Sequence, residues 1–98
     1  MQIEISSVAM GDIEIGRQFY EQQQVGLGSY FLENLLADID ALQHSAGVHP
    51  QFFGYCRALS KRFPYAIYYQ VNGELIQIWR VLDCRQHPGK TASALEAH

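Results

Sequence analysis

Two runs of strand-forming residues flank an Asn-Gly pair, and this arrangement restricts the fold more than any other feature of the sequence. The runs are FPYAIYYQV at residues 63–71 and LIQIWRVL at residues 75–82. Both are rich in the β-branched and aromatic side chains that favour strands. Asn72-Gly73 is a strong signal for a tight hairpin turn. Alternation places Tyr65, Ile67, Tyr69 and Val71 on one face of the first strand, and Ala66, Tyr68 and Gln70 on the other. On the second strand, Ile76, Ile78 and Leu82 are the expected core positions.

The N-terminal half predicts a short strand followed by two helices. Residues 2–8 alternate in polarity, which indicates a strand. A first helix is expected from about Ala9, and a second, with a wide apolar stripe, runs from Phe31 to Leu42 with Ser29 as its N-cap. The glycine-containing break at residues 25–28 is short, so the two helices should pack as an antiparallel hairpin.

Another aromatic-rich run at residues 52–59 adds a further strand, so the predicted order is β-α-α-β-β-β. Strands that follow helices in this way are typical of an α+β domain. We expect a small, mainly antiparallel sheet with the helical hairpin on one face and the other face open. A single domain should span residues 1–90 of the 98, and residues 91–98, after Pro88-Gly89, should form a loose tail.

Composition excludes several classes of protein. Hydrophobic residues make up 48% of the chain and charged residues 17%, which is unlike a disordered chain. We find neither an apolar run of about 18 residues nor a signal peptide, so we expect a cytoplasmic protein without membrane contact. Cys56 and Cys84 lack metal-binding spacing and should be reduced thiols. No histidine cluster or phosphate-binding loop is present in the sequence, and we predict no metal and no cofactor.

Charge is distributed unevenly along the chain. The net charge of −3 combines −6 over residues 1–49 with +3 over residues 50–98. The bases of the second half fall on or next to the predicted strands, where Tyr68 and Trp79 add aromatic surface. Such a cluster binds phosphate, stabilises a phosphorane-like charge, or holds an acidic protein segment. The competing interpretation is an ordinary polar sheet face. The candidate site comprises Arg57, Lys61, Arg62, Tyr68, Trp79, Arg80 and Arg85.

Three segments together resemble the RelE/ParE superfamily of bacterial toxins, often called plasmid-stabilisation proteins. They are Arg57-Ala58-Leu59, the run from Arg62 to Tyr69, and the run from Ile78 to Pro88. The stretches at residues 12–20 and 35–50 resemble the family's two helices and the loop that follows them. The resemblance implies a helical hairpin on a curved antiparallel sheet, and it implies the toxin half of a type II toxin–antitoxin module.

The superfamily contains two activities, and the sequence resembles one branch more closely. RelE-like members cleave messenger RNA on the ribosome, and they or related nucleases carry an arginine and a histidine where this chain has Ala66 and Asp83. An aspartate is a poor proton donor at neutral pH. The segments F-P-Y-x-I-x-Y and R-V-L-x-x-R instead resemble ParE-like toxins, which act on DNA gyrase and are not nucleases.

We therefore predict a ParE-like toxin that inhibits growth by binding its target and is neutralised by a cognate antitoxin. The resemblance allows DNA gyrase as the target, and a homodimer or a heterotetramer with the antitoxin. A first alternative is a RelE-like messenger-RNA endonuclease acting on the ribosome, with Arg57, Lys61, Arg80 and Arg85 as the catalytic and phosphate-binding groups. A second alternative is an inactive homologue that persists as a protein-binding domain.

Overall fold

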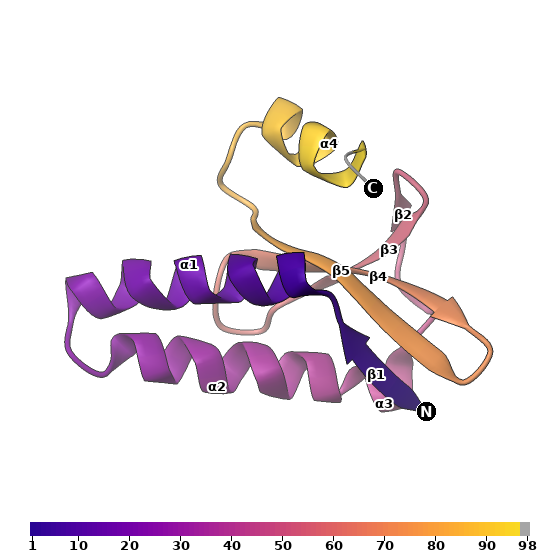
Figure 1. The fold of residues 1–98 in the computed structure, drawn as a ribbon, viewed down its shortest axis with the longest axis horizontal. Helices are drawn as coiled ribbons and strands as arrows, with labels where there is room; N and C mark the ends of the chain where they lie inside the picture. Colours follow the sequence, from indigo (N-terminus) through magenta and orange to yellow (C-terminus); the bar gives the residue numbers. More distant parts are fainter. Residues whose placement is uncertain (97–98) are drawn as a thin grey trace.

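A computed structural model describes residues 1–96 (Figure 1). Strand β1 (Gln2–Ile5) leads into helices α1 (Ser7–Gln23) and α2 (Leu27–Asp40) and the short α3 (Leu42–Ser45). Strands β2 (Gln51–Phe52), β3 (Tyr55–Leu59), β4 (Tyr65–Asn72) and β5 (Leu75–Asp83) follow, and helix α4 (Pro88–Glu96) completes the described chain. The five strands form one sheet in the order β1-β5-β4-β3-β2.

The sheet confirms the predicted α+β class and its mainly antiparallel character. Strand β1 runs parallel to β5, and every other neighbouring pair is antiparallel. The central hairpin is β4–β5, as the two strand-forming runs predict. Its two-residue turn is Gly73-Glu74 rather than Asn72-Gly73, because Asn72 still pairs with Leu75. Gly73 has a φ of 60° at the first turn position, where a type II′ turn places glycine.

Helices α1 and α2 form the predicted antiparallel hairpin and cover one face of the sheet (Figure 1). Their buried residues include Ile13, Phe31 and Leu35, which pack against Tyr65, Ile67 and Tyr69 of β4. A Cβ atom at Gly16 would lie 2.6 Å from the Phe31 ring, so this glycine permits close packing of the two helices.

The N-terminus of α2 differs from the prediction. The helix begins at Leu27, after Gly26 with a φ of 90°, and Ser29 lies inside its first turn instead of capping it. The carboxylate of Glu21 on α1 accepts hydrogen bonds from the backbone N–H groups of Gly26 and Gly28. The side chain of Glu21, on the preceding helix, therefore caps the N-terminus of α2 in place of Ser29. The sequence pattern did not predict this contact.

The second face of the sheet is not open along its whole length. Helix α4 lies across it, on the opposite side from α1 and α2 (Figure 1). Leu95 is only 2% exposed and packs with Tyr55, Ala66, Tyr68 and Leu82. Residues 91–96 thus belong to a helix that packs on the sheet, and they do not form the predicted loose tail. The reason is that Leu95 is buried against the apolar residues of this sheet face. Residues 97–98 lie outside the described part of the chain.

The predicted strand at residues 52–59 is a small hairpin of β2 and β3. Phe52 pairs with Tyr55, and the intervening turn holds Phe53 and Gly54 at φ values of 53° and 83°. Two successive positive φ angles are typical of a type I′ turn. Phe53 is a poor residue for this conformation, which explains why the turn was not predicted.

A β-bulge in β5 changes which side chains face the core. Tyr68 pairs with Arg80 and Tyr69 with Ile78, so Trp79 is an extra residue in β5. Before the bulge, Ile76 and Ile78 face the helical hairpin, as expected. Beyond it, Val81 faces the hairpin, whereas Leu82 turns to the α4 side, where it is buried in a second apolar cluster.

Candidate binding surface

The structure separates the predicted basic cluster into several places. Arg57, Tyr68 and Trp79 lie on the sheet face that α4 partly covers. Lys61 and Arg62 lie in the loop between β3 and β4, and both are exposed. Arg80 lies at the edge of β5 towards α1, and Arg85 follows the end of β5. The seven residues therefore do not form one continuous site.

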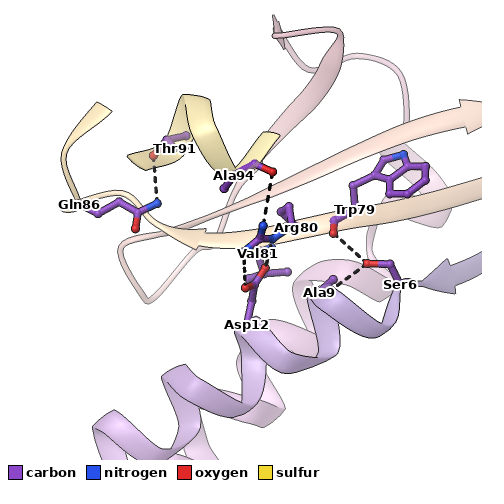
Figure 2. A network of polar contacts seen from close by, with 9 residues as sticks. All are labelled: Ser6, Ala9, Asp12, Trp79, Arg80, Val81, Gln86, Thr91 and Ala94. Atoms are coloured by element: carbon purple, nitrogen blue, oxygen red, sulfur yellow. Dashed lines mark hydrogen bonds and ion pairs between the residues drawn. The ribbon is translucent and has the colours of Figure 1, made fainter. Parts of the chain in front are cut away.

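Arg80 is part of the framework that joins α1 to the sheet (Figure 2). Its Nε donates to Oδ2 of Asp12 at 2.7 Å, and its Nη2 donates to Oδ1 at 2.9 Å. Oδ2 also accepts the backbone N–H of Val81 at 3.0 Å. The side chains of Arg80 and Asp12 are only 18% and 11% exposed, and hydrogen bonding to Asp12 raises the pKa of Arg80. This guanidinium is consequently not available to a ligand.

Ser6 fastens the same junction next to the bulge (Figure 2). Its hydroxyl accepts the N–H of Ala9, which caps α1, and donates to the carbonyl of Trp79 at 2.8 Å. Ser6 and Asp12 thus bind the outer edge of β5 on both sides of Arg80. The bulge, the start of α1 and the Arg80 ion pair form one structural unit.

Arg85 is exposed but also paired. It forms an ion pair with Asp83 at 2.8 Å, and its guanidinium carbon lies 5.9 Å from the Phe19 ring centre. Hydrogen bonding to Arg85 lowers the pKa of Asp83. Asp83 is therefore ionised at neutral pH and has no proton to donate.

Arg57 differs from these arginines because no carboxylate within residues 1–96 pairs with its side chain. Its guanidinium carbon lies 4.7 Å from the ring centre of Phe52, and its Nε is buried without a hydrogen-bond partner. Tyr68 is directly opposite on β4. Burial raises the pKa of the Tyr68 hydroxyl, although the positive charge of Arg57 opposes this effect. The hydroxyl is therefore protonated at neutral pH and can donate a hydrogen bond.

Two hollows meet at Arg57 and Phe52. The first, which we name the α4 hollow, has a volume of about 260 Å³ and lies between the β2–β3 hairpin and the start of α4. The second, the Leu59 hollow, has a volume of about 390 Å³. The α4 hollow is lined by Phe52, Phe53, Arg57, Tyr68, Cys84, Gln86, Pro88 and Thr91. The Leu59 hollow is lined by His49, Pro50, Phe52, Arg57 and Leu59.

The sequence did not predict several of the residues that line the two hollows. Phe53 reaches the surface because of an unpredicted turn, and Thr91 belongs to an unpredicted helix. The usable signals were Gly54, which tolerates a positive φ, and Pro88, which suits the first turn of a helix. Trp79 lies further along the same face, where its indole donates to Gln70 and its ring packs edge-on against Tyr55.

Neither a metal centre nor a membrane span is found in the described part of the chain. No group of three or more histidine, cysteine, aspartate or glutamate side chains is placed to hold a metal ion there. None of the helices within residues 1–96 has the length and apolar character needed to cross a bilayer. The candidate binding surface is therefore the one formed by Arg57 and the two hollows beside it.

Comparison with known proteins shows a shared fold. No protein-family model matches the sequence, and no curated protein matches it. Among solved structures, it is similar to a chain of one described as "Chromosomal ParDE TA system from P. aeruginosa", with a TM-score of 0.71 and 20% identity. The alignment covers 83% of this chain and 92% of that chain. At this identity the likeness establishes the fold.

Proposed function

We propose that this chain is the toxin of a type II toxin–antitoxin pair, and that it acts in the cytoplasm by binding a target protein. The observation that carries the proposal is the fold shared with a chain of the ParDE system over most of both chains. A surface with an unpaired arginine between two hollows supports it, because soluble domains use such surfaces for partners. The partner is a cognate antitoxin.

Three features favour binding over RNA cleavage. Asp83, at the position where related nucleases place a histidine, has a lowered pKa and cannot supply a proton at neutral pH. Ala66, where RelE-like nucleases place an arginine, is buried beneath α4. Arg80 and Arg85 form ion pairs with Asp12 and Asp83, so their charges are already neutralised within the chain. Of the residues assigned to the endonuclease alternative, Arg57 and Lys61 remain, which is a sparse set for phosphoryl transfer.

For the target we propose a topoisomerase of the DNA gyrase type, following the ParE-like resemblance. The antitoxin would cover the Arg57 surface in a complex of one or two copies of each chain. The alternative of an inactive homologue predicts the same antitoxin complex without inhibition of growth.

Induced expression tests the proposal. The chain is expressed alone and together with the adjacent reading frame, and growth, RNA integrity and plasmid supercoiling are measured. We expect growth arrest that the adjacent product relieves, inhibited supercoiling by purified gyrase, and uncut messages in a translating extract. Codon-dependent cleavage on ribosomes would establish the endonuclease instead, and unimpaired growth would establish the inactive homologue.

A further inference from the structure

We propose that Arg57 anchors a carboxylate of the antitoxin, and that bulky apolar side chains next to this carboxylate fill the α4 hollow and the Leu59 hollow. The proposal rests on the proposed function and adds the chemistry by which the partner is recognised. It concerns one side chain and the two depressions on either side of it.

The first argument is the state of the Arg57 guanidinium. Arg17, Arg80 and Arg85 each pair with a carboxylate of the chain itself. Arg57 has no such partner within residues 1–96, and its Nε is removed from water without an acceptor. A buried donor without a partner is unfavourable and rare in native proteins. An acidic group supplied by another molecule would instead pair with the charge of this guanidinium, which no carboxylate within residues 1–96 neutralises.

The second argument is the fixed orientation of the guanidinium. The packing of Arg57 on the Phe52 ring restricts the plane of the guanidinium, whose two Nη groups make no hydrogen bond within residues 1–96. A planar group held in this way suits the two oxygens of a carboxylate. Tyr68 lines the same α4 hollow, and its protonated hydroxyl adds a donor of the right kind.

The third argument is the apolar character of the surroundings. Phe53 is 57% exposed and Leu59 is 60% exposed, so each hollow has a large apolar side chain at its rim. Phe53 also holds an unfavourable positive φ, and strained residues of this kind are concentrated at binding sites. An occupant that buries these side chains must itself be apolar next to its charge.

These surroundings favour a protein segment over a nucleic acid. Within residues 1–96, Arg57 is the one arginine or lysine that lines either hollow. A nucleic-acid strand presents a charge at every nucleotide and needs several cations along its path. A single fixed arginine between apolar depressions matches an acidic residue flanked by leucine, isoleucine, valine or phenylalanine.

A peptide display library tests the proposal with the intact protein as bait. The library contains random peptides, and selection is run in parallel on the wild type and on Arg57→Met. We expect the wild type to enrich peptides with aspartate or glutamate next to bulky apolar residues, and we expect Arg57→Met to lose this enrichment. Apolar peptides selected equally by both proteins, or no enrichment at all, would overturn the proposal.

A double-mutant cycle on a selected peptide measures the contact itself. Arg57→Met and the exchange of the peptide's acid for its amide should each weaken binding by about 30-fold, as expected for a hot-spot residue. Together they should weaken it no further than either alone. Arg62→Met is the matched control, because it removes the same charge from an exposed loop position outside both hollows, and it should change affinity less than about threefold.

Two further measurements, on an Arg57→Lys variant and on RNA binding, separate loss of the contact from misfolding and a protein partner from a nucleic acid. Arg57→Lys keeps the charge without the planar fork, so it should bind with intermediate affinity, and it replaces Arg57→Met if that variant fails to fold. A fluorescent single-stranded RNA of mixed sequence should bind weakly and independently of Arg57. Displacement of the selected peptide by this RNA, together with loss of RNA binding in Arg57→Met, would assign the site to nucleic acid and overturn the proposal.

The outcome is separable from that of the proposed function. If expression arrests growth and the adjacent product relieves the arrest, but Arg57→Met binds the peptides like the wild type, the toxin assignment holds and the anchor is wrong. If Arg57-dependent acidic peptides are selected but expression leaves growth unimpaired, the anchor holds and the toxin assignment is wrong.

Discussion

Arg57 and Arg80 show how neighbours give the same residue type opposite roles. Both lie on strands and are partly buried. Asp12 satisfies Arg80 with two hydrogen bonds, which ties a helix to the sheet edge. Arg57 has the ring of Phe52 beneath it and no acceptor for its Nε. The first arginine should therefore matter for folding, and the second for binding.

Replacing Arg57 should not harm the folded state. The Arg57→Met variant keeps an unbranched apolar stem and removes the buried Nε, whose unmet hydrogen bond costs about 1–3 kcal/mol, while losing about 0.5–1 kcal/mol of cation–π attraction. We expect a free energy of unfolding that is unchanged or raised by about 1 kcal/mol, measured by urea denaturation. A loss of more than about 1 kcal/mol would show that Arg57 has a structural role.

Phe53 offers a second test at this scale. Asparagine tolerates a positive φ far better than phenylalanine, so Phe53→Asn should stabilise the protein by about 1 kcal/mol. It should also weaken binding of the selected peptides, because the exposed ring is lost. Phe53→Ala is the control, since it removes the ring without relieving the backbone and should weaken binding with no gain in stability. Equal stability of the two variants would contradict a strained turn.

At the scale of the elements, the junction of α1 with β5 depends on one carboxylate. Asp12 binds both the Arg80 guanidinium and the backbone N–H of Val81 beyond the bulge. Asp12→Ala leaves a largely buried cation and a backbone donor without their acceptor. We expect a loss of about 2–3 kcal/mol, somewhat below the value for a fully buried pair because some water reaches the site.

Glu14 provides the matched control on the same helix. It pairs with Arg17 at 2.6 Å, but both side chains are well exposed. Glu14→Ala should therefore leave the urea midpoint unchanged within experimental error, because exposed ion pairs contribute little. If the two variants are equally stable, the Asp12–Arg80 pair is not what holds α1 to the sheet.

The turn between α1 and α2 should respond to acid. Hydrogen bonds from the N–H groups of Gly26 and Gly28 lower the pKa of Glu21 below its usual value. A lowered folded-state pKa stabilises the protein above the unfolded-state pKa, and this contribution is lost as pH falls through the folded-state value. Glu21→Gln should therefore be less stable than the wild type at pH 7, and the difference should shrink once the pH falls below the ordinary glutamate pKa and vanish below the lowered folded-state pKa. A difference that is constant from pH 7 to pH 3 would contradict this role of the carboxylate.

The sequence predicts an element when that element's own residues determine it. The β4–β5 hairpin and the apolar stripe of α2 depend on local patterns, and both were predicted. The bulge at Trp79 depends on α1, through Ser6 and Asp12, and no pattern within β5 reveals it. Helix α4 is similar, since its nine residues gain their stability from the docking of Leu95 on a distant patch.

The candidate site was predicted in part for the same reason. Residue types were enough to propose Arg57 and Tyr68 as candidates, and the structure places them opposite each other on neighbouring strands. Pairing between charges was not predictable, because Asp12 is 68 positions from Arg80. The sequence alone thus could not separate the satisfied arginines from the unsatisfied one.

At the scale of the whole molecule, charge should direct how a partner approaches. Residues 1–49 sum to −6 and residues 50–98 to +3. An acidic segment is therefore attracted to the strands and repelled by the helical hairpin. Steering of this kind acts on association rates and is screened within about 10 Å at 0.1 M salt. We expect the association rate of a selected acidic peptide to fall several-fold between about 0.05 and 0.5 M NaCl, with a nearly constant dissociation rate.

Stopped-flow measurements check this expectation, with the exposed Lys61 and Arg62 as probes. Lys61→Gln combined with Arg62→Gln should slow association and leave dissociation unchanged. A salt effect confined to the dissociation rate would place the electrostatic contribution in the bound complex instead.

The parallel pairing of β1 with β5 sets the order in which the molecule can be completed during translation. Strand β1 is synthesised before β5, the strand that pairs with it. The hydrogen bond from Ser6 to the carbonyl of Trp79 cannot form until the chain has grown by a further 73 residues. At about 5–20 residues per second, the interval is about 4–15 seconds. During this time β1 lacks its strand partner, and α1 lacks the sheet edge that Asp12 binds. The nascent chain therefore cannot form the finished fold until the residues of β5 have been synthesised, so α1 and α2 must first pack together without their strand partner.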